Sequence, residues 1–246
     1  CRRLREAFLW AAARPTQAIV LMGGGDFWSN GLHLNLIEAA ESPADESMRN
    51  IEAMDDLAEA ILCATSRLVI AALQGNAGAG GCFLARAADL VWLRDGVILN
   101  PHYKNMGNLY GSEFWTYLLP TRVGEEGACR IMANRLPMTA RNAVACGFYD
   151  EVLDGDPLAF RADVARRAAE LASSPDLAAR LKAKGEKRER DEAAKPLAAW
   201  RAEELAHMER NFHGFDPSYH VARWHFVRKS PPSWTPRHLA SHRVQA

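Results

Sequence analysis

Short apolar runs alternate with longer amphipathic segments along most of the chain. The runs at 18–22, 68–73, 90–93 and 97–99 have the length and apolar character of strands buried on both faces. Segments with apolar residues every three or four positions predict helices. The expected helices cover 2–13, 48–66, 82–88, 112–119, 124–133, 139–146, 157–183 and 197–211. The alternation favours an α/β fold with a mostly parallel sheet.

Capping and breaking residues set several of these boundaries. Ser112 is placed to act as the N-cap of the helix over 112–119, and Pro120 is expected to end it. Thr139 is a suitable N-cap for the helix over 139–146, and Gly147 a suitable C-terminal stop. Residues 149–153 are expected to form a short edge strand.

Two glycine-rich segments, 23–31 and 74–81, each follow a predicted strand. Glycine lets bare backbone come close to a ligand. Two separate strand ends could each offer a backbone N–H to the same oxygen, as in an oxyanion hole. The helix that begins at Cys82 would add the positive end of its dipole.

A dinucleotide-binding loop is an alternative interpretation of the second segment. Gly75, Gly78 and Gly80 lie between a strand and a helix, and Asp95 follows Gly75 at the spacing of a ribose-binding acid. The pattern is G-x-x-G-x-G rather than G-x-G-x-x-G, however, and the following helix is short. This interpretation also leaves the segment 23–31 unexplained. A third possibility is that both segments only permit tight turns.

Composition narrows the class of protein. Lys+Arg and Asp+Glu both number 30, which argues against a nucleic-acid partner. No apolar run approaches the roughly 18 residues of a membrane span. Five cysteines without a CxxC pair are expected to be reduced core or near-core thiols of a cytoplasmic protein. The chain begins with Cys1, and we expect it to be part of a longer protein.

The two glycine segments resemble the paired signatures of the crotonase (enoyl-CoA hydratase/isomerase) superfamily. Residues 27–34, FWSNGLHL, are similar to the first signature, and residues 74–82, QGNAGAGGC, to the second. Residues 139–153 are similar to a later segment, A-x-x-x-G-[LF]-x-D-E-V. The resemblance implies a spiral of ββα units that binds an acyl-CoA. It also implies that the N–H groups of Leu32 and Gly80 hold the thioester oxygen, with Gly31 and Gly78 beside the substrate.

The departures from the hydratase pattern are informative. Phe83 stands where hydratases have a catalytic Glu, and His102 follows Asn100-Pro101 where they have a second Glu. With neither carboxylate present, we do not expect addition of water to a double bond.

A narrower resemblance extends over the rest of the chain. Residues 100–117 and 195–229 resemble the C-terminal crotonase-like domain of the HypX/HoxX family of hydrogenase maturation proteins. In that family an N-terminal domain transfers a formyl group from formyl-tetrahydrofolate to coenzyme A. The crotonase-like domain is then understood to convert formyl-CoA to CO and CoA, and the CO becomes the carbonyl ligand of [NiFe]-hydrogenase. The resemblance therefore implies a formyltransferase domain upstream and other hydrogenase maturation proteins as possible partners.

Such a decarbonylation needs a base, a polarised carbonyl and a proton for the leaving thiolate. Glu113, expected in the first turn of a helix, can act as the base if burial raises its pKa. Tyr103 could donate a proton or orient the formyl group. His102 and Tyr110 are further candidates for substrate contact. The spacing of His220 and His225 suits no simple metal geometry, so no metal site is expected.

We expect residues 1–185 to form the crotonase-like domain and 186–246 to form a C-terminal helix and an arm that wraps over the domain. The charged stretch 184–195 is expected to be a solvated helix face or a linker. Two other functions stay open on sequence grounds. One is a different crotonase-type reaction, such as hydrolysis or isomerisation of a thioester, and the other is a non-catalytic docking module.

Overall fold

The structure is a computed structural model that describes residues 1–230. Its first sheet has the order β1-β3-β5-β8, and all neighbouring strands are parallel. The strands are β1 (Ala18–Leu21), β3 (Leu68–Leu73), β5 (Leu90–Arg94) and β8 (Glu151–Leu153). The three apolar runs that predict the first three strands are confirmed. The edge position expected for residues 149–153 is also confirmed, because β8 is the last strand of this sheet.

A second sheet of short strands has the order β2-β4-β6-β7. Its strands are β2 (Phe27–Ser29), β4 (Asn76–Gly78), β6 (Ile98–Asn100) and β7 (Met138–Thr139). Only the β6–β7 pair is antiparallel. β2 and β4 lie inside the two glycine segments, where three residues are too few to show a strand period. Each first-sheet strand β1, β3 and β5 is thus followed by a second-sheet strand and then by helix, which is the predicted ββα repeat.

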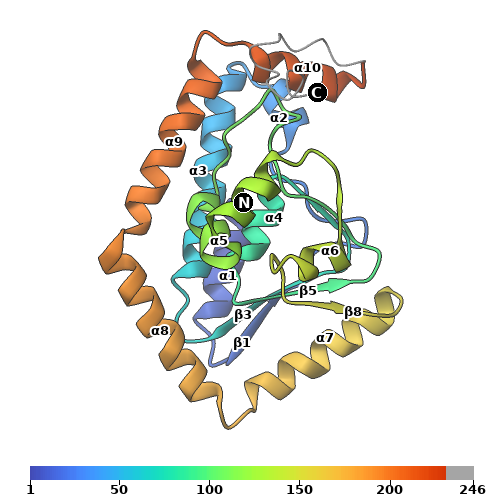
Figure 1. The fold of residues 1–246 in the computed structure, drawn as a ribbon, viewed down its shortest axis with the longest axis vertical. Helices are drawn as coiled ribbons and strands as arrows, with labels where there is room; N and C mark the ends of the chain where they lie inside the picture. Colours follow the sequence, from blue (N-terminus) through green and yellow to red (C-terminus); the bar gives the residue numbers. More distant parts are fainter. Residues whose placement is uncertain (231–246) are drawn as a thin grey trace.

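The main core lies between the first sheet and a layer of helices (Figure 1). The layer contains α1 (Arg2–Ala12), α3 (Pro43–Leu62) and α4 (Gly80–Arg86), and all seven residues of α4 are buried. On the other face of the sheet, α7 (Pro157–Ala172) buries Phe160 and Val164 against a smaller core. Both faces of the sheet are therefore covered, as the continuous apolar runs predict.

The helix α5 (Trp115–Ala133) differs from the prediction at its start and in its middle. Ser112 is not its N-cap, because the Ser112 hydroxyl donates to the Asp55 carboxylate instead. Pro120 does not end the helix either. The chain continues past it and kinks at Gly124, where φ is 74°.

The C-terminal third is more helical than predicted. The helix α6 (Ala140–Ala145) has the predicted Thr139 cap, and Gly147 follows it with φ of 79°. The helix expected over 157–183 is two helices, since Pro175 lies in a break between α7 and α8 (Leu177–Ala194). Residues 185 and 186 lie inside α8.

Two further helices follow α8. α9 (Leu197–His213) runs beside α3, and α10 (Ser218–Arg228) packs beside the short helix α2 (Leu34–Glu38) (Figure 1). Part of the expected wrapping arm is therefore a helix, and the rest of the arm lies outside the described residues.

The cysteine prediction is partly wrong. All five cysteines are free, but only Cys82 is buried, while Cys1, Cys63, Cys129 and Cys146 are exposed. Cys63 and Cys146 are at helix C-caps, where the chain turns at the surface.

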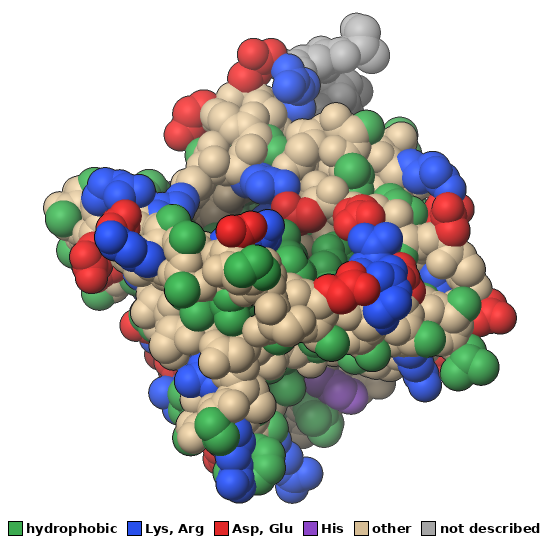
Figure 2. All heavy atoms as spheres, turned by 90° about the horizontal axis from the view of Figure 1, so that it is seen from below, with side chains coloured by type: hydrophobic (Ala, Val, Ile, Leu, Met, Phe, Trp, Pro, Cys, Tyr) green, Lys and Arg blue, Asp and Glu red, His purple; other side chains and the backbone are tan. Residues whose placement is uncertain are grey.

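The surface shows no concentration of one charge on the face drawn in Figure 2, where Lys and Arg side chains lie next to Asp and Glu. Within residues 1–230, no helix is both long and apolar enough to cross a membrane.

Candidate active site

Two backbone amides come together where β2 and β4 end. The strands pair in parallel, so Gly31 after β2 lies next to Gly80 at the start of α4. A Cβ added to Gly31 would lie 3.5 Å from the Gly80 nitrogen. Among the hydrogen bonds of residues 1–230, none uses the N–H of Leu32 or of Gly80 as donor. A backbone N–H without a partner is one requirement for a donor in an oxyanion hole.

The Glu113 carboxylate lies directly against Gly80. A Cβ added to Gly80 would meet Glu113 Oε1 at 2.5 Å and Oε2 at 2.7 Å. Tyr103 donates a hydrogen bond of 2.5 Å from its Oη to Glu113 Oε2, and both side chains are buried. The structure therefore brings together Gly31, Gly80, Tyr103 and Glu113, which are far apart in the sequence.

Glu113 is not in the first turn of a helix, contrary to the sequence-based expectation. It precedes α5 with a φ of 63°, and Phe114 follows with a φ of 58°. Left-handed backbone costs a non-glycine residue about 1–2 kcal/mol. Such conformations persist where the surrounding structure imposes them.

Two buried carboxylates hold this left-handed segment. Asp55, from α3, accepts hydrogen bonds from Ser112 Oγ at 2.6 Å and from the Glu113 N–H at 2.9 Å. Glu204, from α9, accepts from the N–H groups of Phe114 and Thr116, both at 2.9 Å. Glu204 also accepts from the Thr116 hydroxyl.

Sequence reasoning missed both acids, although a signal exists. Asp55 lies between Met54 and Leu57 on the apolar face of its helix. Glu204 lies one turn before Met208 on the buried stripe of α9. An acidic residue in the apolar phase of a helix is costly to bury without a partner and therefore indicates a specific contact.

Burial makes all three acids bind protons more tightly than usual, and the charge of Asp55 adds to this effect at Glu113 and Glu204. Burial, and then the charge of Asp55, raise the pKa of Glu113 to about 8, against the lowering effect of the Tyr103 hydrogen bond. Burial raises the pKa of Glu204 to about 8 and that of Asp55 to about 6. Burial and the Glu113 charge raise the pKa of Tyr103 well above its usual value. A carboxyl group with the pKa of Glu113 can accept and return a proton near neutral pH.

Phe83, in the position of the missing hydratase Glu, forms an apolar wall beside these groups. Its side chain is fully buried and stacks on the Tyr103 ring, with 5.5 Å between ring centroids. The Trp115 ring lies 6.5 Å away from Phe83, also between centroids. The carboxyl and phenol groups therefore have aromatic rings beside them.

The other two candidates lie differently. His102 is buried, and within residues 1–230 neither of its ring nitrogens has a hydrogen-bond partner. Burial lowers the pKa of His102, which favours the neutral ring. Tyr110 stacks on His207 of α9 at 3.9 Å between centroids, and its N–H donates to Asn211 Oδ1. No hydrogen bond in the described part of the chain joins His102 or Tyr110 to Glu113.

Gly78 is constrained by its neighbour in the other glycine segment. A Cβ added there would lie 2.9 Å from Asn30 Oδ1. The contact keeps the two glycine segments close to each other beside the Gly80 amide.

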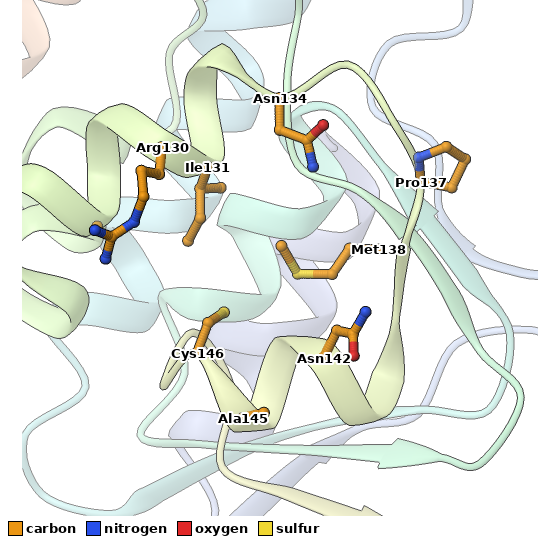
Figure 3. A pocket seen from close by; sticks show the side chains of 9 residues that line it. Arg130, Ile131, Asn134, Pro137, Met138, Asn142, Ala145 and Cys146 are labelled. Carbon is orange, nitrogen blue, oxygen red and sulfur yellow. The ribbon is translucent and has the colours of Figure 1, made fainter.

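Two pockets lie away from these residues. The larger, of about 470 Å³, opens between α5 and α6, and Ile131, Met138 and Cys146 are among the residues that line it (Figure 3). The second, of about 340 Å³, is bordered by α5 and α8. None of the predicted site residues lines either pocket. Within residues 1–230, no group of three His, Cys, Asp or Glu side chains could hold a metal ion.

Comparisons with known proteins show the family of the chain. Residues 4–236 match the family model described as enoyl-CoA hydratase/isomerase. The chain is 56% identical, over 245 residues, to the hydrogenase maturation factor HoxX of Bradyrhizobium diazoefficiens; the match covers all of this chain and 43% of that protein. The family match replaces the dinucleotide-binding interpretation of Gly75–Gly80.

Solved structures give the same result. A crystal structure of HypX from Aquifex aeolicus in complex with tetrahydrofolic acid is similar with a TM-score of 0.91 and 50% identity, over 98% of this chain and 43% of that one. The enoyl-CoA hydratase of Bacillus halodurans, at 17% identity and a TM-score of 0.76 over 90% of this chain and 87% of that one, shares the fold. The chain thus spans less than half the length of the HoxX and HypX relatives.

Proposed function

Because this chain belongs to the enoyl-CoA hydratase/isomerase family, we propose that it binds a coenzyme A thioester and that the thioester is formyl-CoA, which it converts to CO and free CoA. One observation carries the proposal. Glu113 and Tyr103 form a buried hydrogen-bonded pair against Gly80, in a chain that lacks both hydratase carboxylates.

The reaction moves one proton from carbon to sulfur. The N–H groups of Leu32 and Gly80 polarise the formyl C=O by donating to its oxygen. Glu113 takes the formyl proton, the C–S bond breaks with its electron pair on sulfur, and CO leaves. The thiolate then takes the proton from Glu113. Atoms and charge balance, because formyl-CoA yields one CO and one CoA thiol.

Tyr103 keeps one oxygen of Glu113 occupied, which leaves Oε1 for the reacting proton. Gly31, Gly78, His102 and Tyr110 are proposed to contact the substrate. Phe83 disfavours hydrolysis in this proposal, because its apolar ring offers an attacking water no hydrogen-bond partner beside the pair.

The relatives support a wider role. We propose that the CO supplies the carbonyl ligand of [NiFe]-hydrogenase in the cytoplasm, and that formyl-CoA comes from a formyl-tetrahydrofolate-dependent transferase domain of the same protein. The hydrogenase maturation role in the name of the Bradyrhizobium relative and the tetrahydrofolic acid in the Aquifex crystal support this. We also propose residues 1–185 as the crotonase-like unit and 186–246 as its C-terminal extension.

Incubation of the full natural protein with formyl-CoA tests the reaction, with reduced haemoglobin present to trap CO. We expect carbonyl-haemoglobin in step with free thiol, and a loss of about 10²–10⁴-fold in the Glu113→Gln variant. No CO from the natural protein, or undiminished CO from the variant, contradicts the proposal. Formate in place of CO would indicate thioester hydrolysis.

A further inference from the structure

We propose that Asp55 and Glu204 are positioning residues that hold Glu113 against Gly80, so that α9 of the C-terminal extension completes the site. The inference rests on the role proposed above for Glu113. It assigns a function to two buried acids that the reaction scheme does not use.

The backbone before α5 does not keep its shape unaided. Glu113 and Phe114 are consecutive left-handed residues, and Gly111, with φ of 95°, precedes Glu113 by two positions. The N–H groups of residues 113, 114 and 116 donate to side chains of other elements. Without those acceptors these three N–H groups would lack protein partners, and the turn would lose its main restraint.

The two acids act from opposite ends of the turn. Asp55 takes the N–H of Glu113 and the hydroxyl of Ser112, and so fixes the residue that carries the candidate base. Glu204 takes the N–H groups on the helix side, at Phe114 and Thr116. Together they orient the Glu113 side chain from its backbone.

Ion pairing does not account for either acid. Arg201 Nε is 3.9 Å from Asp55 Oδ2, but Arg201 makes a closer contact of 2.7 Å with Asp56. Among the salt bridges of residues 1–230, none includes Glu204, although its side chain is fully buried. A buried acid without a cation destabilises a fold. Both acids are instead placed where they hydrogen-bond the turn that carries Glu113.

The same acids influence the charge on Glu113. The titratable groups around its carboxyl are Tyr103, Asp55 and Glu204, with Arg201 beyond Asp55 and the Cys82 thiol near Tyr103. The negative charges of Asp55 and Glu204 both raise the pKa of Glu113. Removing the charge of Asp55 should therefore let Glu113 ionise at lower pH.

Two isosteric variants separate charge from geometry. In Asp55→Asn, the amide oxygen can still accept from the Glu113 N–H, and the Ser112 hydroxyl can turn to accept from the new NH₂. In Glu204→Gln, one oxygen becomes an NH₂ that cannot accept, so one of the turn's N–H groups loses its partner. Matched controls are Glu52→Gln and Glu203→Gln, on the same helices, whose side chains are exposed.

The first readout is CO formation by the full natural protein and its variants as a function of pH. For Glu204→Gln we expect kcat to fall by about 10–100-fold while KM changes by less than about threefold, because a misplaced base slows the chemical step. For Asp55→Asn we expect the rise of kcat/KM with pH to move to lower pH, with a smaller loss in kcat. Both controls should match the natural protein within about twofold.

The second readout does not require activity. Infrared titration follows the C=O stretch of protonated Glu113, identified by its loss in Glu113→Gln. Asp55→Asn should lower the pH at which this band disappears, even if the natural protein forms no CO. If the band titrates unchanged in Asp55→Asn and kcat of Glu204→Gln matches its control, the positioning role is wrong.

Ser112→Ala is a third variant for the case that a charge change prevents folding. It removes one of the two donors to Asp55 without adding bulk. Faster hydrogen exchange at the amides of residues 113 and 114, with kcat reduced severalfold, supports the proposal. Unchanged exchange and unchanged kcat contradict it.

Discussion

The Glu113 carboxylate fills the space that a side chain at Gly80 would need, since a Cβ there would lie 2.5 Å from Glu113 Oε1. Gly80 thus contributes in two ways. Within residues 1–230 its N–H is free to donate, and its lack of a side chain leaves space for the Glu113 carboxylate. This space lets the candidate base lie next to the candidate oxyanion donor.

Replacement of Gly80 should test this contact. Gly80→Ala puts a methyl group into the Glu113 carboxylate, and we expect CO formation to fall by at least about 100-fold, since small displacements of a catalytic group have effects of that size. Gly185→Ala is the control, because a Cβ at Gly185 on α8 meets nothing within 4 Å. It should keep full activity and gain about 0.5–1 kcal/mol in the free energy of unfolding. Normal activity of Gly80→Ala would mean that Glu113 lies elsewhere during the reaction.

The Tyr103 hydroxyl should set the pH range of the reaction. Its hydrogen bond lowers the pKa of Glu113, so Tyr103→Phe should raise that pKa further and move the rise of kcat/KM to higher pH. Tyr219→Phe removes a comparable hydroxyl, buried and bonded to Ser47 at 2.6 Å, away from the site. Its profile should coincide with that of the natural protein. A profile of Tyr103→Phe that does not move would exclude the hydroxyl as a partner of the base.

The buried acids should make the fold less stable as pH rises. The pKa of Glu113 is raised from 4.5 to about 8, so the unfolded chain loses this proton first. The contribution of Glu113 to the stability of the fold is therefore largest below about pH 4.5. It falls as the pH rises from there to about pH 8. Urea unfolding at pH 5 and pH 8 measures this loss. The free energy of unfolding should fall less between the two pH values in Glu113→Gln than in the natural protein, with a difference on the order of a few kcal/mol.

Surface ion pairs act in a different window, which serves as an internal control. The pKa of Asp163 is lowered from 3.8, mainly by its hydrogen bond to Arg166. Such groups stabilise the fold above their unfolded pKa and lose this effect as pH falls through the folded pKa. They do not contribute to the change between pH 5 and pH 8. If the free energy of unfolding depends on pH equally in Glu113→Gln and in the natural protein, then Glu113 is not buried in its protonated form.

Lys184 should anchor α8. Its Nζ contacts Asp89 Oδ2 at 2.6 Å and the carbonyl oxygens of Ala64 and Arg67 at 2.8 and 2.9 Å. Lys184→Met should lower the free energy of unfolding by about 2–3 kcal/mol, because these acceptors lose a charged donor. Lys182→Met, whose side chain is 79% exposed, should change it by less than about 0.5 kcal/mol. Urea unfolding of both variants measures the difference. Equal losses of unfolding free energy in the two variants would mean that Lys184 does not anchor α8.

Patterns within one segment predicted most of the first sheet and its helices. The run 68–73 is buried along its whole length, and its neighbours in the sheet come from equally apolar runs. Thr139 caps a helix because its side chain accepts a hydrogen bond from the N–H of Asn142, only three residues away. These features depend on neighbours in the sequence, and so a single sequence carries them.

Features that depend on distant residues were missed or misplaced. Ser112 has the composition of an N-cap, but Asp55, 57 positions away, takes its hydroxyl. Glu113 was found as a candidate only through family resemblance, and its left-handed backbone is imposed by Asp55 and Glu204 rather than by local propensity. The strands β2 and β4 were missed because three residues carry no period and gain their partners from each other.

The support of one turn by α3 and α9 also has a consequence for how the molecule forms. The two contacts join residues 55 and 204 to the segment 112–116, so they close two long loops of chain. Closing long loops is entropically costly and comes late in folding. A nascent chain that has reached β8 can already have all of its first sheet, yet Glu113 becomes fixed only after α9 has been synthesised and docked. The arrangement would delay the reactive geometry until nearly all of the described chain is in place.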